Sequence, residues 1–395
     1  MLQGGQVFFP KLVQAIDSST REVRMETYIF CVEAAGGRVA EALERAAHRG
    51  VAVYLVMDGV GTPNIPLEWE TRFDAAGVKW RIFSPLGRLG ILIPSRWRRL
   101  HRKLCVVDGT VAFCGGINVL DDFYDPNHGP LDSPRFDFAV SVSGPLVHEA
   151  QETMARFWWR LQVAGLVQHS DVQTAWQTLQ VTVKQVLQTS AHADEKTKAG
   201  HHVFHTKAAL VLRDNLRNRS RIERSYRKAI GTATQEIIIA NAYFVPGRKL
   251  RKSLIHAAQR GVRVRLLLQG RYEYFMQFHA TRPVYEALLA AGVEIHEYAV
   301  SFLHAKVAVI DGHWATVGSS NLDPLSLLLA REANVVVDDV TFALDLRARL
   351  ECAFVEDGIR VDPAAYANRP WRQRLLDRIA FGIMRILLFL NGKRY

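Results

Sequence analysis

The sequence predicts an α/β protein made of two related halves, because one motif occurs twice and the segments around it repeat as well. "HRKLCVVDGTVAFCGGIN" at 101–118 corresponds to "HAKVAVIDGHWATVGSSN" at 304–321. Upstream, "RVAEALERAAHRGVAVYLVMDG" at 38–59 corresponds to "KLRKSLIHAAQRGVRVRLLLQG" at 249–270. Each upstream segment combines an amphipathic helical pattern with a glycine and an apolar strand. A chain of 395 residues is also longer than a single hydrophobic core usually becomes.

Each half predicts the order strand, helix, strand, helix, strand, and then a hairpin that carries the motif. The opening strands are "REVRMETYIF" and "QEIIIANAYF", and the later strands begin in "AAGVKW" and "AAGVEI". Such alternation is typical of an α/β/α sandwich with a central sheet. We therefore expect an N-terminal half at 1–165, a linker at 166–205, a C-terminal half at 206–363 and a tail at 364–395.

The composition favours anionic partners. Lys and Arg number 50 against 39 Asp and Glu, and the net charge of +11 suits phospholipid surfaces or nucleic acid. Four cysteines without a CxxC pair predict a reducing compartment and no cysteine-based metal site. Neither a signal peptide nor a run of about eighteen apolar residues is present, so we expect neither secretion nor a membrane span.

The repeated motif places a histidine two positions before a lysine, as His101 and Lys103 and again as His304 and Lys306. Side chains two apart on a strand project from the same face. If the halves meet, two imidazoles and two ammonium groups surround one anionic centre. One imidazole can attack phosphorus while the other protonates the leaving oxygen and later deprotonates an incoming hydroxyl. The ammonium groups offset charge on the phosphoryl oxygens, so phosphodiester chemistry is expected without a metal ion or cofactor.

The motif contains further candidate site residues. Asp108 and Asp311 complete the motifs, but each precedes a glycine in a predicted hairpin turn, so a structural role stays open beside a catalytic one. Each histidine also needs an orienting partner, for which Asp137 and Glu332 lie in matching places; surface salt bridging is the alternative. Small residues and asparagines after each hairpin are expected to hold phosphate: Gly116, Asn118, Ser319 and Asn321.

The two halves also differ. Gly116 stands where the second half has Ser319, which removes one hydroxyl and predicts an asymmetric site. His101 lies 24 positions after Gly77, whereas His304 lies 12 positions after Gly292. The additional residues include "LGRLGILIPSRWRR" at 86–99, which is either an ordinary surface loop or a basic, apolar lip that meets lipid or substrate.

The duplicated HxKxxxxD motif followed by G-[GS]-x-N resembles the phospholipase D superfamily over nearly the whole chain, and most of all its bacterial short-type cardiolipin synthases. The resemblance implies a duplicated phospholipase D-type α/β/α sandwich, whose two pseudo-symmetric halves share one central active site. It implies that His101 attacks phosphatidylglycerol, that glycerol leaves with His304 as general acid and base, and that a second phosphatidylglycerol attacks the phosphohistidine. It also implies a peripheral enzyme on the cytoplasmic side of the bacterial cell membrane.

The C-terminal tail, "RPWRQRLLDRIAFGIMRILLFLNGKRY" at 369–395, predicts a basic amphipathic helix. Its arginines, with Arg385 near the middle, favour a position in the membrane interface rather than across the bilayer. Docking on the protein's own core is the alternative. We expect the tail and the basic loop 86–99 to contact anionic phospholipids. The apolar residues recur every three or four positions: Trp371, Leu375, Ile379, Ile383, Ile386 and Leu390.

Several alternatives stay open at this stage. The same residues can serve a phospholipase D-type hydrolase, or another phosphatidyltransferase that uses phosphatidylethanolamine or a different alcohol. A nuclease would suit the charge, but the apolar tail favours lipid, and no nucleic acid is expected. A non-catalytic membrane scaffold is disfavoured by two complete motifs. The "DDFYDP" loop is expected to be a solvated turn, and no metal is expected at His201, His202 and His205.

Overall fold

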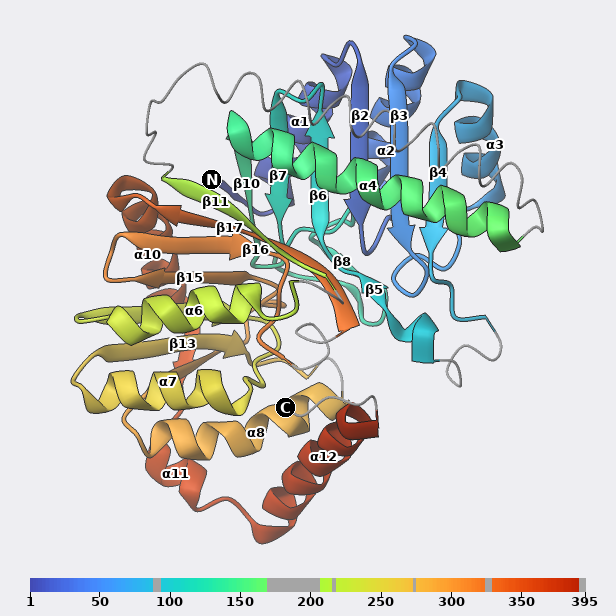
Figure 1. The fold of residues 1–395 in the computed structure, drawn as a ribbon. Helices are drawn as coiled ribbons and strands as arrows, with labels where there is room; N and C mark the ends of the chain where they lie inside the picture. Colours follow the sequence, from blue (N-terminus) through green and yellow to red (C-terminus); the bar gives the residue numbers. More distant parts are fainter. Residues whose placement is uncertain (88–93, 169–206, 215–217, 273–274, 324–328, 391–395) are drawn as a thin grey trace.

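The chain folds into two α/β halves, each built on one large sheet, in a computed structural model (Figure 1). The structure describes residues 1–87, 94–168, 207–214, 218–272, 275–323 and 329–390. Most of the expected linker, with His201, His202 and His205, lies outside these residues, as does part of loop 86–99. The prediction of a duplicated α/β sandwich is confirmed.

In the first half, seven strands form a sheet of order β1-β10-β7-β6-β2-β3-β4. The strands joined by helices, β2, β3 and β4, run parallel, whereas the hairpin strands β6, β7 and β10 pair antiparallel. The strand bounds are β1 Leu2–Gln3, β2 Glu22–Thr27, β3 Ala52–Asp58, β4 Lys79–Phe83, β6 Lys103–Val107, β7 Val111–Gly115 and β10 Phe138–Ser143. Apolar side chains pack one face of this sheet against three helices and the other against a fourth: α1 Gly5–Asp17, α2 Ala34–His48 and α3 Leu67–Ala76, and opposite them α4 Pro145–Gln168.

The second half repeats this arrangement in the order β11-β17-β16-β15-β12-β13-β14-β18. The hairpin strands again lie beside a parallel group, so the repeat in sequence is a repeat of topology. The strand bounds are β11 Ala208–Arg213, β12 Glu236–Asn241, β13 Arg263–Gln269, β14 Glu294–Tyr298, β15 Lys306–Ile310, β16 Trp314–Gly318, β17 Ala330–Asp338 and β18 Gly358–Arg360. The helices are α6 Arg221–Thr232, α7 Arg248–Gln259 and α8 Phe275–Leu289 on one face and α10 Val340–Glu356 on the other, with α11 Pro363–Ala367 beyond.

One hydrophobic core joins the halves. It includes Leu104 and Phe138 from the first sheet and Val307 and Val335 from the second, all at most 2% exposed. Burial of a large apolar side chain contributes about 1.5–3 kcal/mol, so this core holds the halves in a fixed relation. The short strand β5 (Arg99–Leu100) also pairs in parallel with β17 of the second half. The segment that leads into the first motif therefore pairs with the strand that follows the second motif. The remaining short elements of the first half are η2 Pro94–Trp97, β8 Tyr124–Asp125 and β9 Gly129–Pro130.

Helix α12 (Trp371–Leu390) lies against α8 at the end of the second half (Figure 1). Asp377 is 3% exposed, and its carboxylate contacts His279 Nδ1 at 2.8 Å and Arg369 at 2.9 Å. The helix thus docks on the protein by a polar contact. In the part of the chain that the structure describes, no helix is long and apolar enough to cross a bilayer.

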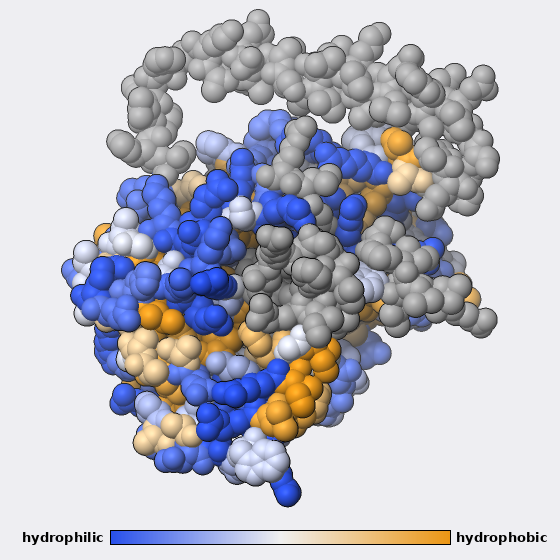
Figure 2. Space-filling view, turned by 60° about the horizontal axis from the view of Figure 1, so that its bottom comes forward, coloured by the Kyte–Doolittle hydropathy of each residue, from blue (hydrophilic) through white to orange (hydrophobic). Residues whose placement is uncertain are grey.

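The opposite face of α12 leaves apolar side chains in solvent. Figure 2 shows a hydrophobic strip on this side of the molecule. One face of the helix docks on the protein, as the alternative interpretation expected, while the position of the other face in a membrane stays a prediction. The side chains of Ile386 and Leu390 are outside the described ones. The outward face comprises five residues that are 39–69% exposed: Trp371, Leu375, Leu376, Ile379 and Ile383.

Candidate active site

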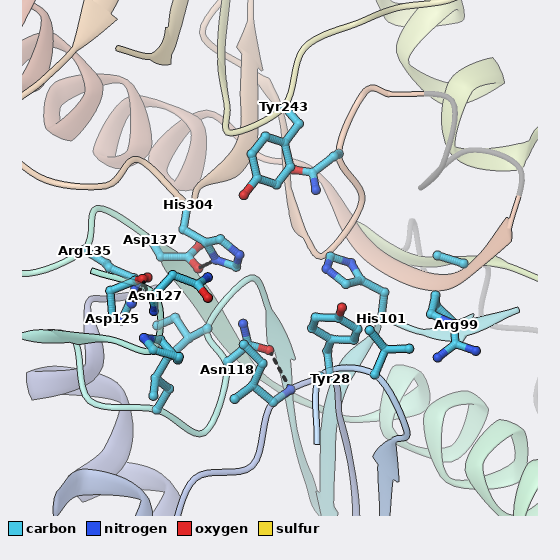
Figure 3. Close-up of a pocket in the computed structure, with 18 of the residues that line it drawn as sticks. Tyr28, Arg99, His101, Asn118, Asp125, Asn127, Arg135, Asp137, Tyr243 and His304 are labelled. Carbon is cyan, nitrogen blue, oxygen red and sulfur yellow. Dashed lines mark hydrogen bonds and ion pairs between the residues drawn. The ribbon is translucent and has the colours of Figure 1, made fainter. Parts of the chain in front are cut away.

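The two motif histidines lie in one pocket between the halves. His101 and His304 stand just before β6 and β15, and both line a cavity of about 560 Å³ (Figure 3). Lys103 and Lys306 follow on these strands and are 6% and 0% exposed. Lys103 Nζ donates to the His101 carbonyl at 2.7 Å, and Lys306 Nζ donates to the His304 carbonyl. The repeated motif thus brings two imidazoles and two buried ammonium groups to one centre.

Each histidine is oriented by a carboxylate from the other half. His101 Nδ1 lies 2.9 Å from an oxygen of Glu332, and His304 Nδ1 lies 2.6 Å from an oxygen of Asp137. A protonated Nδ1 that donates to a carboxylate leaves Nε2 with a free lone pair. Neither half by itself therefore holds a complete histidine site.

The backbone repeats this exchange. The His101 N–H donates to the carbonyl of Arg331 at 3.0 Å, and the His304 N–H donates to the carbonyl of Phe136 at 3.0 Å. Arg331 and Phe136 directly precede the orienting carboxylates in the sequence. Main chain and side chain thus fix each imidazole against the opposite half.

Burial tunes the charges of these groups. Burial lowers the pKa of the His101 imidazole, against the opposing effect of the Glu332 carboxylate. Burial, together with the charges of Lys306 and Lys103, holds the pKa of His304 well below its usual range. Burial and the charge of Lys306 lower the pKa of Lys103 to about 7. Before substrate binds, the imidazoles are therefore neutral near pH 7, as a nucleophile or general base must be.

Comparison with known proteins agrees with this geometry. A family profile described as "Cardiolipin synthase, PLD-like domain" matches residues 12–128 and 226–353. Cardiolipin synthase B of Salmonella typhi is 36% identical over 392 residues, which cover 99% of this chain and 89% of that protein. Cardiolipin synthase B of Escherichia coli K12 is 34% identical over 401 residues, covering 99% and 89%. The chain belongs to the cardiolipin synthase family of phospholipase D-like proteins.

A solved structure shows the same fold at low sequence identity. Phosphatidylserine synthase of Haemophilus influenzae Rd KW20 superposes with a TM-score of 0.64 over 98% of this chain and 94% of its own, at 11% identity. The resemblance to the phospholipase D superfamily stated from the motifs is therefore confirmed.

Both asparagines of the family motif line the pocket. Asn118 Oδ1 accepts from the backbone N–H of Ile29 at 3.2 Å, which leaves its amide nitrogen directed toward the space near the imidazoles (Figure 3). Asn321 is 2% exposed, and its Oδ1 has no hydrogen-bond partner among the residues that the structure describes. Both amides are thus placed where a bound phosphate ester can reach them.

Gly116 and Ser319, expected to bind phosphate, support the orienting carboxylates instead. Ser319 is fully buried, its hydroxyl donates to Glu332, and it accepts from the Ala333 N–H at 3.0 Å. A Cβ at Gly116 would come within 2.2 Å of an Asp137 oxygen, so only glycine permits this close packing. The two halves therefore differ in how the orienting carboxylate is held: a serine hydroxyl donates to Glu332, whereas a glycine packs closely against Asp137.

Asp108 and Asp311 do not join the histidines. Each sits on a hairpin turn with positive φ, at the opposite end of its strand from the lysine, about 16 Å away at strand spacing. Asp108 accepts from the backbone N–H groups of Thr20, Arg21 and Glu22 at 2.8–2.9 Å. Asp311 makes the matching contacts in the second half. The geometry therefore supports a structural role for these two aspartates, in the hairpin turns, rather than a catalytic one.

Two tyrosines enter the pocket without having been singled out in the sequence. Tyr28 follows β2 directly, Tyr243 follows β12 one residue later, and both line the cavity (Figure 3). The Tyr28 ring lies edge-on to the His101 ring with centroids 4.9 Å apart. In the aligned strands "REVRMETYIF" and "QEIIIANAYF" the two tyrosines stand one position apart, so the repeat did not single them out.

The "DDFYDP" loop is a wall of the pocket, so its interpretation as a solvated turn was wrong. Asp122 and Asp125 are 7% and 4% exposed, and both line the cavity. Asp122 accepts from the Gly5 N–H, and Asp125 pairs with Arg135 at 2.7 Å and with His128 at 3.0 Å. These partners come from outside the loop or from its far end, and a local turn pattern does not reveal them. Within the described ranges, no group of three or more His, Cys, Asp or Glu side chains is arranged to hold a metal ion.

Proposed function

We propose that this chain is a cardiolipin synthase, which transfers the phosphatidyl group of one phosphatidylglycerol to the glycerol hydroxyl of another. The observation that carries the proposal is the pair of histidines, each held at Nδ1 by a carboxylate of the other half and both lining one pocket. The relatives over nearly the full chain are named cardiolipin synthase B. A phosphatidyltransferase needs such a pair, because one group must carry the phosphatidyl unit while the other moves protons.

In the first step, His101 Nε2 attacks phosphorus and the bond from phosphorus to the glycerol oxygen breaks. His304 donates the proton to that oxygen. Burial and the lysine charges lower the pKa of His304; the anionic phosphodiester offsets the lysine charges, so substrate binding favours the protonated imidazole that this step needs. Lys103, Lys306, Asn118 and Asn321 hold the phosphoryl oxygens as charge accumulates on them.

In the second step, the neutral His304 removes a proton from the glycerol hydroxyl of a second phosphatidylglycerol. The hydroxyl oxygen attacks phosphorus, the bond from phosphorus to His101 breaks, and cardiolipin forms. One phosphodiester bond replaces another, so the reaction needs no nucleotide to activate the substrate. Glu332 and Asp137 keep both imidazoles in one tautomer through both steps.

We also propose that the protein binds the cytoplasmic face of the bacterial membrane through α12 and the basic loop 86–99. The outward face of α12 carries Trp371 and exposed aliphatic side chains (Figure 2), a pattern that suits the membrane interface. From the loop, Trp97 and Arg99 reach the pocket wall itself. The cysteines, all described, are free thiols, as a reducing compartment favours.

The test is turnover of labelled phosphatidylglycerol in mixed micelles by the wild type, His101→Ala and His304→Ala. His148→Ala serves as control, because His148 lies exposed on α4. We expect cardiolipin and free glycerol from the wild type and the control, and neither product from the two site variants. Phosphatidic acid in place of cardiolipin would make water the acceptor and the protein a hydrolase, which would overturn the proposal.

A further inference from the structure

The pocket has two chemically different sides. Arg99 lies beside His101 (Figure 3), where its guanidinium pairs with Asp58 at 3.0 Å. Asp125 and Asn127 lie on the side of His304 (Figure 3). Asp122 lines the pocket from the same loop. Each side thus carries an arginine paired with a carboxylate, Arg99 with Asp58 and Arg135 with Asp125, and the His304 side adds the amide of Asn127.

In-line displacement assigns a different part of the substrate to each side. The nucleophile and the leaving oxygen lie on opposite sides of phosphorus, so with His101 as nucleophile the leaving glycerol lies toward His304. The incoming hydroxyl enters along the path by which the leaving one departed. One set of contacts therefore meets both the departing glycerol and the glycerol unit of the acceptor lipid. This step rests on the proposed function.

The groups on the His304 side suit a neutral polyol. Asp122 accepts one hydrogen bond from the Gly5 N–H, and a carboxylate has further acceptor positions for hydroxyl donors. Asn321, which lines the same pocket, adds a second, independent sign of a ligand. Its Oδ1 is buried in the pocket wall and lacks a partner in the described part of the chain, which costs free energy unless a ligand donates to it.

Asp125 supplies rigidity rather than a free acceptor. Its carboxylate oxygens pair with the Arg135 guanidinium and the His128 imidazole and accept from the Asn127 N–H, at 2.7–3.0 Å. The loop is therefore fixed before substrate arrives, and Asn127 is held at the pocket edge. A preformed set of polar groups recognises hydroxyls with little cost of ordering.

We propose that Asp122, Asn127 and Asn321 form a glycerol subsite that binds the hydroxyls of the leaving glycerol and of the acceptor's glycerol unit. The subsite selects a polyol acceptor over a simple alcohol. Asp122 and Asn127 act as specificity-determining residues for the transfer, and Asp125 positions the loop that carries Asn127.

The test is a competition for the phosphatidyl-enzyme. Phosphatidylglycerol in mixed micelles is incubated with equal concentrations of deuterated glycerol and propan-1-ol, and mass spectrometry gives the ratio of deuterated phosphatidylglycerol to phosphatidylpropanol. Both products come from one intermediate, so the ratio does not depend on how much of a variant is folded. The proteins are the wild type, Asp122→Asn, Asn127→Ala and the control Asp132→Asn, whose side chain is exposed in the same loop region.

We expect the wild type and Asp132→Asn to share a strong preference for glycerol. Asp122→Asn and Asn127→Ala should each lower the ratio about tenfold, the size expected for one hydrogen bond lost. An unchanged ratio in both variants would overturn the subsite while leaving the transferase intact. A wild type that transfers the phosphatidyl group to no alcohol would instead overturn the proposed function.

Discussion

At the scale of single residues, the reactivity of each imidazole depends on a carboxylate that the opposite half contributes. Glu332 is fully buried and contacts both His101 and the Ser319 hydroxyl. Asp137 is 3% exposed, packs against Gly116 and contacts His304. The sequence predicted both carboxylates as orienting groups, but the strand patterns did not show that they cross between halves.

Glu332→Gln and Asp137→Asn should each lower turnover about 100-fold, because an amide no longer fixes the imidazole tautomer. Ser319→Ala should have a smaller effect, about tenfold, since it removes only a support of Glu332. The measurement is kcat in mixed micelles, with the melting temperature as a check on folding. Turnover above one third of the wild-type value in Glu332→Gln would contradict this role.

Burial of Lys103 links activity to stability. Its pKa is about 7 in the folded protein and near 10.5 in the unfolded chain, so the unfolded state binds more protons between these values. Burial of the charged ammonium therefore lowers the free energy of unfolding fully below pH 7. This destabilisation decreases as the pH rises toward 10.5. Lys103→Met should abolish turnover yet raise the melting temperature, with a larger gain at pH 6 than at pH 9. Equal gains at both pH values would show that Lys103 is charged in the fold throughout this range.

At the scale of elements, the motif aspartates hold each hairpin to the start of the neighbouring strand. Asp108 contacts the chain before β2, and Asp311 contacts the chain before β12. Partial burial raises the pKa of each carboxyl, but the backbone donors outweigh it, and the pKa of both is lowered. The Asp-Gly pair predicted the turn, while the contacts to a distant strand could not be inferred from local pattern.

Asp311→Ala should leave three backbone N–H groups without their carboxylate partner and destabilise the protein by about 1–3 kcal/mol. Turnover per folded molecule should stay within about threefold of the wild type, because Asp311 lies far from the histidines. Chemical denaturation and kcat measured on the same preparation provide the check. A 100-fold loss of kcat in a fully folded variant would instead place Asp311 in the catalytic machinery.

Helix α12 gives a test of membrane attachment that is separate from catalysis. The double variant Ile379→Glu, Ile383→Glu places charge on the outward face and should lower cosedimentation with phosphatidylglycerol vesicles about tenfold. Turnover of a short-chain, monomeric phosphatidylglycerol should be unchanged. Val355→Glu is the control, since Val355 is 82% exposed near the end of α10. An equal loss of vesicle binding in the control would contradict the proposal that α12 attaches the protein to the membrane.

At the scale of the whole molecule, the duplicated halves and their shared active site could be predicted because the repeat is long and the motif residues are chemically specific. Tyr28 and Tyr243 were not predicted, because they stand one position apart in the aligned strands. The buried wall formed by Asp122 and Asp125 was not, because their partners Gly5 and Arg135 become neighbours only in the fold. Local patterns predict elements well, whereas contacts between distant segments determine which polar residues face the pocket.

The central claim is that the two halves form one site, in which His101 carries the phosphatidyl group and His304 moves the protons. The most direct measurement is rapid quench of the wild type in alkaline denaturant, which preserves the acid-labile bond between phosphorus and histidine, during turnover of labelled phosphatidylglycerol. Mass spectrometric mapping at neutral to alkaline pH then identifies the modified residue. The account predicts label on His101, none on His304, and none in Glu332→Gln at the same early time. Label on His304 would reverse the roles of the halves, and turnover without any labelled histidine would contradict the phosphohistidine mechanism.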